Sequence, residues 1–238
     1  MNLRKIAYPL IIATTFLLNH GEKRNYGIFE SHASKNPRFY GKGEEIIECV
    51  ERNLPKIFAR QRRILEARDS VLPKVTYGPI DSGYHYGNYY SHLDLIKLDT
   101  SYLDPKFCKD AIIHENTHAY MNRLSREMGN GNWPTFSNAR NFTYEDIGIK
   151  LVGEGIAEYM ENRGKVVDSI KEWPSNAFLL YTSLNFYTQG YHLVKPLLDK
   201  YGAESVRPMI LRPPQGEEVF HPEQWQDTIR ARIKSMRN

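Results

Sequence analysis

The chain has 238 residues, enough for one domain with short extensions but not for a large array of modules. Hydrophobic residues make up 41% and charged residues 25%, as in ordinary globular domains. This composition excludes global disorder and a membrane protein with many spans. Lys and Arg exceed Asp and Glu by 32 to 28, for a net charge of +4. Because this excess is small, we expect no nucleic-acid partner.

The first 20 residues have the layout of a secretory signal. Arg4 and Lys5 precede a mostly apolar run from Ile6 to Leu18, which resembles a charged n-region and a short h-region. The run is shorter than the about 20 apolar residues that a transmembrane helix needs. No small-x-small cleavage site follows it, so cleavage is atypical or the segment stays as a membrane anchor. Either interpretation predicts a protein that is secreted, periplasmic or anchored facing outside the cytoplasm. A hydrophobic first helix packed on the domain is the alternative.

A polar stretch, residues 21–43, is predicted to be a linker or extended arm, and residues 44–238 to form the domain. Residues 44–69 have helical periodicity, and Pro55 introduces a kink or begins a second helix there. The basic residues of this segment are expected to form its solvated face rather than a binding patch. They are Lys56, Arg60, Arg62, Arg63 and Arg68.

Three short β-type runs follow, at residues 74–77, 84–90 and 92–98, and turn residues separate them. They predict a small antiparallel sheet directly before the next helix. The run 92–98 is also a candidate edge for pairing with an extended peptide, with an ordinary sheet strand as the alternative.

Helix signals dominate the rest of the chain, so the predicted fold class is α+β, mostly helical. Asp104 is a suitable N-cap before Pro105, and Gly129 suits the end of that helix. Thr143 and Asp146 predict the start of the next helix, which runs to about residue 163. Further helices are predicted at 174–187, 190–201 and 222–236.

The chemically informative motif is His114-Glu115-Asn-Thr-His118. On a helix His114 and His118 lie one turn apart on the same face, so both imidazoles can bind one metal ion. Glu115 lies at the edge of that face. Zinc lowers the pKa of a bound water toward about 7, and a neighbouring carboxylate can take its proton. The motif therefore predicts one Zn²⁺ per chain with Glu115 as the general acid/base. Ordinary core or surface histidines are the alternative.

A catalytic zinc needs a third protein ligand. No third His follows His118 at a suitable distance, but the downstream segment Gly153-Glu154-Gly155 offers a carboxylate. Two glycines in a helix cost about 1 kcal/mol each, which is reasonable if the helix passes very close to another backbone. Glu154 is therefore the preferred third ligand. Glu158, one turn later, is the alternative ligand, or it accepts a hydrogen bond from a ligand His and so orients it. The non-functional alternative is that these residues, with Glu161, form the acidic solvated face of a helix.

The motif His114-Glu115-x-x-His118, followed by Gly-Glu154-Gly-Ile-Ala-Glu-Tyr, resembles the gluzincin group of zinc metallopeptidases. The run from Phe186 to Gly202 is similar to the helix that follows in small domains of this kind. The resemblance implies a zincin-like fold and hydrolysis of peptide bonds in a peptide or protein substrate. It also implies that His114, His118 and Glu154 bind zinc and that Glu115 is the general acid/base.

Three points remain open at this stage. The donor for the oxyanion could be Tyr187, Tyr191 or His192, and Tyr191 is the preferred candidate. The only two cysteines, Cys49 and Cys108, allow at most one disulfide within the chain, and the sequence does not show whether they are close. The alternative to a peptidase is a zincin-fold binding module that has lost catalysis.

Overall fold

The computed structural model describes residues 37–66, 68, 71–80, 86–133, 143–162, 173 and 186–238. The predicted N-terminal signal lies outside these residues, as do most of the predicted linker and residues 174–185 of a predicted helix. The chain divides into two units, Met1–Gly43 and Glu44–Asn238, and the candidate site lies in the second. Within the described part, no helix has both the length and the apolar character needed to cross a bilayer.

The first described helix, α3 (Pro37–Leu65), begins earlier and ends earlier than predicted, and Pro55 lies inside it. Ile46, Val50 and Leu54 are buried, as their helical spacing indicates. A disulfide between Cys49 and Cys108 links α3 to the start of the helix that carries the His pair. Disulfides persist in oxidising compartments, which indicates a protein outside the cytoplasm.

The sheet has three strands, β1 (Lys74–Tyr77), β2 (Gly87–Tyr90) and β3 (Leu95–Leu98), in the order β1-β3-β2. β2 pairs with β3 antiparallel, but β1 pairs with β3 parallel. The sheet is therefore mixed, and the prediction of a wholly antiparallel sheet is wrong. The reason is that β3 lies between β1 and β2 instead of following β2 at the edge. The prediction of a substrate edge at 92–98 is wrong for the same reason, because β2 and β1 are the edge strands.

The helix with the His pair, α4 (Cys108–Glu127), follows a short 3-10 turn, Pro105–Phe107. The side chain of Asp104 accepts from the amide of Lys106, so Asp104 caps this turn as predicted. The next helix, α5 (Tyr144–Glu161), has a reciprocal capping box between Thr143 and Asp146. The predicted start signal is confirmed for α5, whereas Asp104 caps the 3-10 turn before α4 and α4 itself begins at Cys108 without a side-chain cap.

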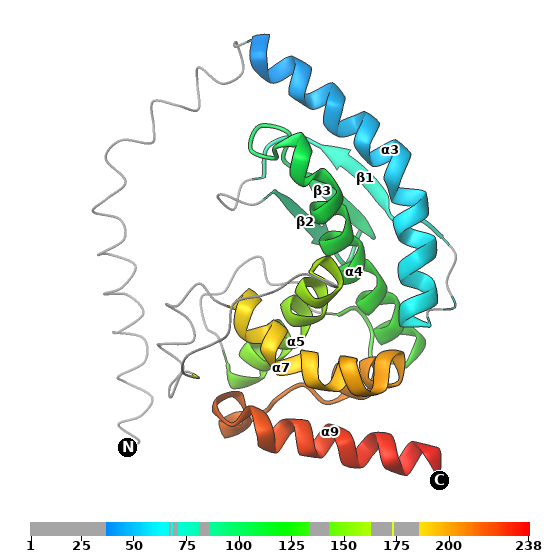
Figure 1. The fold of residues 1–238 in the computed structure, drawn as a ribbon, viewed down its shortest axis with the longest axis vertical. Coiled ribbons are helices and arrows are strands. Elements are labelled where there is room, and N and C mark those ends of the chain that lie inside the picture. Colours follow the sequence, from blue (N-terminus) through cyan, green and yellow to red (C-terminus); the bar gives the residue numbers. More distant parts are fainter. Residues whose placement is uncertain are drawn as a thin grey trace, which may run out of the picture. The chain divides into compact units, whose positions relative to one another are not determined.

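The C-terminal half is helical: α7 (Phe186–Tyr201), a 3-10 turn Gly202–Ser205, α8 (Val206–Leu211), a 3-10 turn Gly216–Phe220 and α9 (Pro222–Arg237). Trp225, Ile229 and Ile233 of α9 are fully buried, as their spacing predicts. Figure 1 shows the strands beside α4, with α5, α7 and α9 following in turn on the other side of α4. The mostly helical α+β fold class, with a sheet before the His-bearing helix, is confirmed.

The second unit contains two hydrophobic clusters. One joins the C-terminal part of α3 with α4, α5, α7, α8 and α9, and the other joins the preceding part of α3 with the sheet and α4. Because α4 contributes to both clusters, it is held from both sides. This fixes the helix that presents the His pair.

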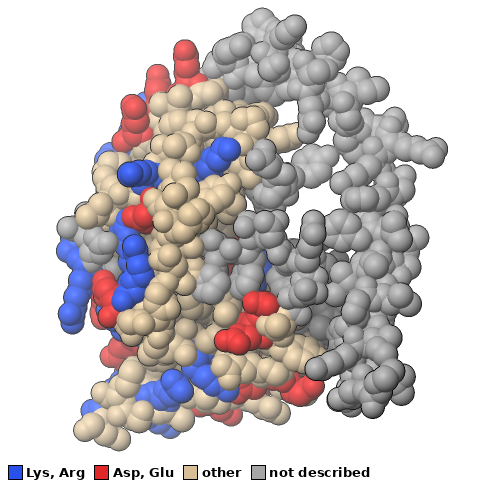
Figure 2. Space-filling view, turned by 180° about the vertical axis from the view of Figure 1, so that it is seen from behind, with Lys and Arg blue, Asp and Glu red and all other residues tan. Residues whose placement is uncertain are grey.

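The surface carries no single basic patch on the face drawn in Figure 2, where Lys and Arg side chains are interspersed with Asp and Glu. The basic residues of α3 named above are all exposed, as predicted for the solvated face of an amphipathic helix.

Candidate metal centre

Three side chains from two helices, α4 and α5, converge in the second unit. The rings of His114 and His118 on α4 have centroids 4.9 Å apart. One oxygen of Glu154 on α5, Oε2, lies 3.1 Å from Nε2 of His114 and 3.5 Å from Nε2 of His118. The three side chains are only 12–17% exposed. The sequence therefore predicted correctly which residues come together.

The spacing of these atoms fits a tetrahedral metal ion. Zn–N and Zn–O bonds of about 2.0–2.1 Å at tetrahedral angles place neighbouring ligand atoms about 3.3–3.4 Å apart. The two distances from Glu154 Oε2, 3.1 and 3.5 Å, bracket this value. All three potential ligand atoms lie within 4.8 Å of one another. His114, His118 and Glu154 can therefore hold a metal ion with a fourth position left for water or substrate.

The electrostatics of the cluster explain its stability without a metal ion. Burial alone lowers the pKa of the His114 imidazole, but hydrogen bonds to Glu154 and Glu161 hold that pKa well above its ordinary value. Burial alone raises the pKa of Glu154, but His118 and His114 hold it well below its ordinary value. The carboxylate and the imidazoles therefore favour each other's charged forms.

Glycines let α5 reach this position. A Cβ on Gly155 would lie 2.2 Å from the carbonyl oxygen of Gly190 on α7, so the two backbones are in contact there. A Cβ on Gly153 would lie 3.3 Å from the Trp133 indole nitrogen and 4.0 Å from Cε1 of His118. The prediction that the glycines permit close passage is confirmed, but the backbone that α5 touches belongs to α7 rather than to α4.

The other ring nitrogen of His114, Nδ1, faces carboxylates further along α5. Glu161 Oε2 lies 3.3 Å away and Glu158 Oε1 3.7 Å away. Burial and the neighbouring Glu161 both raise the pKa of Glu158, which also accepts a 2.7 Å hydrogen bond from Asn162. Glu161 is therefore the nearer partner of Nδ1, and a ligand His commonly donates its second N–H to such a carboxylate.

The Glu115 side chain interacts with the charges of His114 and His118 and lies against β2 of the sheet. Its side chain is buried, with 7% exposure, and the backbone N–H of Tyr89 on β2 is near enough to lower the pKa of its carboxyl group. Burial raises its pKa, while His114, His118 and the Tyr89 amide act in the opposite direction. A carboxylate close to the metal position, with a raised pKa and no ligand role, suits proton transfer.

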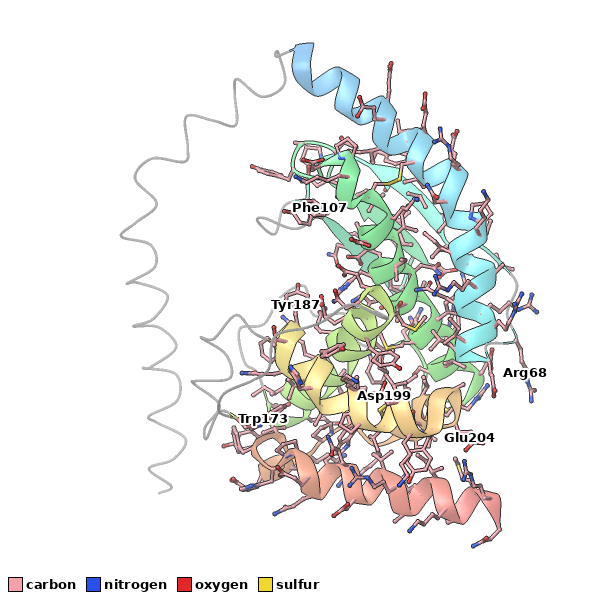
Figure 3. The ribbon with its side chains drawn as sticks, in the orientation of Figure 1. Arg68, Phe107, Trp173, Tyr187, Asp199 and Glu204 are labelled. Carbon is pink, nitrogen blue, oxygen red and sulfur yellow. A yellow bond between two sulfur atoms is a disulfide. The ribbon has the colours of Figure 1, made fainter. Side chains whose placement is uncertain are left out.

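Tyr187 lies at the first turn of α7, where Figure 3 labels it. Its ring centroid is 5.8 Å from that of His114. The charge of Glu154 and then burial raise its pKa, so the phenol keeps its proton at neutral pH. Tyr191 is instead buried, and its ring contacts those of Tyr159 and His192. Tyr187, rather than the preferred Tyr191, is the tyrosine whose ring lies near His114.

Buried polar contacts hold α4 on its opposite side. Gln61 of α3 donates to the carbonyl of Ile113 at 2.8 Å and to Oγ1 of Thr117 at 2.7 Å. Asn116 donates to the carbonyl oxygen of the Gln61 side chain. These bonds surround the residues between His114 and His118, so the rotation of α4 about its axis is fixed by α3 as well as by apolar packing.

Sequence reasoning missed two features of the site. Glu161 was grouped with the solvated acidic face, although its seven-residue spacing from Glu154 places both on one side of α5. The contact between β2 and Glu115 depends on how the sheet packs against α4. No local pattern in the sequence predicts this packing.

No protein-family model, curated protein or solved structure matches this chain. The interpretation of the site therefore rests on its residues and their geometry.

Proposed function

We propose that this protein is a zinc-dependent peptidase that hydrolyses peptide bonds outside the cytoplasm. The observation that supports this best is the combination of a tetrahedral His114, His118 and Glu154 cluster with a separate buried carboxylate, Glu115. A protein that only stores or senses a metal ion has no need of Glu115. The resemblance of both motifs to gluzincins agrees with this proposal, and the disulfide agrees with the compartment.

In the proposed mechanism His114, His118 and Glu154 hold zinc, which when bound supplies Lewis acidity and lowers the pKa of water toward about 7. Glu115 accepts a proton from the attacking water as the oxygen adds to the substrate carbonyl carbon. The C–N bond then breaks, and Glu115 passes the proton to the leaving amine nitrogen. The products are one carboxylic acid and one amine, so the reaction needs no other reactant than water.

Two neighbours support this chemistry. The protonated hydroxyl of Tyr187 is a suitable donor for the negative charge that develops on the carbonyl oxygen. Glu161, through Nδ1 of His114, keeps the imidazole oriented with Nε2 toward the metal position. Each of these groups acts on a different atom of the reaction.

The proposal is tested with protein purified without a polyhistidine tag. Metal analysis should find one zinc per chain, and a mixed peptide library read by mass spectrometry should supply a cleaved substrate. Glu115→Gln should then keep its zinc and lose hydrolysis by at least about 100-fold, because Gln cannot accept the proton. Glu45→Gln, at an exposed position on α3, is the matched control and should remain active.

Two outcomes would reject the peptidase. Equal hydrolysis by the parent and Glu115→Gln, both with full zinc, would assign the activity to another group or to a contaminant. Stoichiometric zinc without cleavage of any peptide would favour a binding module of the same fold.

A further inference from the structure

β2 is an edge strand, and the side of its backbone that does not pair with β3 lies next to the Glu115 side chain. The carbonyl of Tyr86 accepts from the amide of Asp99 on the β3 side at 3.0 Å, so residue 86 faces into the sheet. Backbone groups alternate along a strand, and β2 is at an edge, so Gly87 and Tyr89 face outward. The outward N–H of Tyr89 lies on the same side of β2 and lowers the pKa of the Glu115 carboxyl group.

Gly87 leaves room for the same side chain. A Cβ at this position would lie 2.8 Å from Cγ of Glu115 and 3.1 Å from its Oε1, and 3.0 Å from Cδ2 of Leu98. The backbone does not require a glycine, because Gly87 is not among the residues with positive φ. Glycine inside a strand weakens the strand and commonly marks a close approach by another group. Here the approaching group is Glu115.

We propose that Gly87 is a positioning residue, and that Gly87 and the Tyr89 amide together form a seat that holds the Glu115 carboxylate for catalysis. This inference rests on the proposed role of Glu115 and adds the part of the sheet that fixes it. The absent side chain lets the carboxyl group lie against β2, and the amide of Tyr89 holds one of its oxygens. Alanine at position 87 would push Glu115 off this seat without touching His114, His118 or Glu154.

The first experiment needs no activity. In ¹⁵N-labelled full-length protein, the Tyr89 amide should show the downfield proton shift and slow hydrogen exchange of an N–H bound to a carboxylate. Glu115→Ala and Gly87→Ala should both move this amide upfield and speed its exchange by at least about 10-fold, since each removes the same hydrogen bond. If the chemical shift and exchange rate of the Tyr89 amide were unchanged in Gly87→Ala, the proposed role of Gly87 in positioning Glu115 would be wrong.

The second experiment is a double-mutant cycle on thermal unfolding. If Gly87 makes room for Glu115, the loss of Tm caused by Gly87→Ala should shrink by at least about half in a Glu115→Ala background, because the crowded atoms are then absent. The proposal would be overturned if Gly87→Ala lowered Tm equally in the parent and in the Glu115→Ala background, and lowered it less in a Leu98→Ala background. Gly87 would then serve packing within the sheet.

The third experiment uses zinc-loaded protein and a cleaved peptide. Gly87→Ala should keep one zinc and lower kcat by about 10-fold to 100-fold with little change in KM, since a displacement of about 1 Å can cost about 100-fold. Full kcat with full zinc would overturn the seat while leaving the peptidase intact. If no peptide is cleaved by the parent, the peptidase fails, and the amide measurement and the cycle still decide the seat.

Discussion

Replacement of Glu154 by Gln tests whether the α5 carboxylate is the third metal ligand. Gln keeps the size of the side chain but removes the negative charge. Glu154 carries this charge readily, because His118 and His114 hold the pKa of its carboxyl group well below the ordinary value. Because Glu154 Oε2 lies 3.1 and 3.5 Å from the two His nitrogens, it is placed to share a metal ion with them. We expect zinc affinity to fall by more than the about 100-fold limit seen for residues outside the ligand set.

The two later carboxylates of α5 supply the internal comparison. Glu161 lies 3.3 Å from Nδ1 of His114, within hydrogen-bond distance, whereas Glu158 lies 3.7 Å away and is hydrogen-bonded by Asn162. Glu161→Gln should therefore weaken zinc binding by about 10-fold to 100-fold. Glu158→Gln should leave zinc bound, with less than about 10-fold change in its affinity, and change activity more than affinity.

The affinities are measured by competition between metal-free protein and a chromogenic chelator, with Glu45→Gln as the exposed control. The predicted order of loss is Glu154 first, then Glu161, then Glu158. If Glu154→Gln binds zinc within about 10-fold of the parent, the tetrahedral assignment is wrong. If Glu158→Gln shows the largest loss, the ligand role passes to Glu158.

Two further predictions concern stability. The Cys49–Cys108 disulfide closes a loop with a separation of 59 residues, so replacing both cysteines by Ser should lower the free energy of unfolding by about 4 kcal/mol. For a domain of this size this corresponds to a fall of about 8–16 °C in Tm. A fall in Tm below about 2 °C would contradict the prediction. Gly155→Ala places a Cβ 2.2 Å from the carbonyl oxygen of Gly190 and should destabilise by at least about 2 kcal/mol in chemical denaturation. Gly43→Ala, where nothing lies within 4 Å, should not lower the stability.

The parts of the site that follow from one helix at a time could be predicted from the sequence. The spacing of His114 and His118 places them on one face of any helix, and the caps at Asp104 and Thr143 show where the helices begin. Glu154 could be identified because its flanking glycines are unfavourable in a helix unless a close contact requires them. Each of these signals is local and has a physical cause that does not depend on the rest of the chain.

Sheet pairing could not be predicted in the same way. The runs at 74–77, 84–90 and 92–98 were predicted to be strands, and each contains one observed strand of four residues, but three such short strands can pair in several orders. The parallel pairing of β1 with β3 places β3 in the centre and β2 at the edge. This order brings Gly87 and Tyr89 to Glu115, so an error in strand order also hides the environment of Glu115.

The choice between Tyr187 and Tyr191 shows the same limit on a helix. Periodicity gives the residues that share a face of α7, but not the neighbour that each face meets. The contact between Gly190 of α7 and Gly155 of α5 decides which face of α7 meets α5, because a side chain at either position would keep the two backbones apart. Tyr187, three residues before Gly190, is then carried to within 5.8 Å of His114, while Tyr191, next to Gly190, turns into the core against Tyr159. One contact between glycines thus accounts for both the approach of Glu154 to the His pair and the placement of the Tyr187 ring near His114.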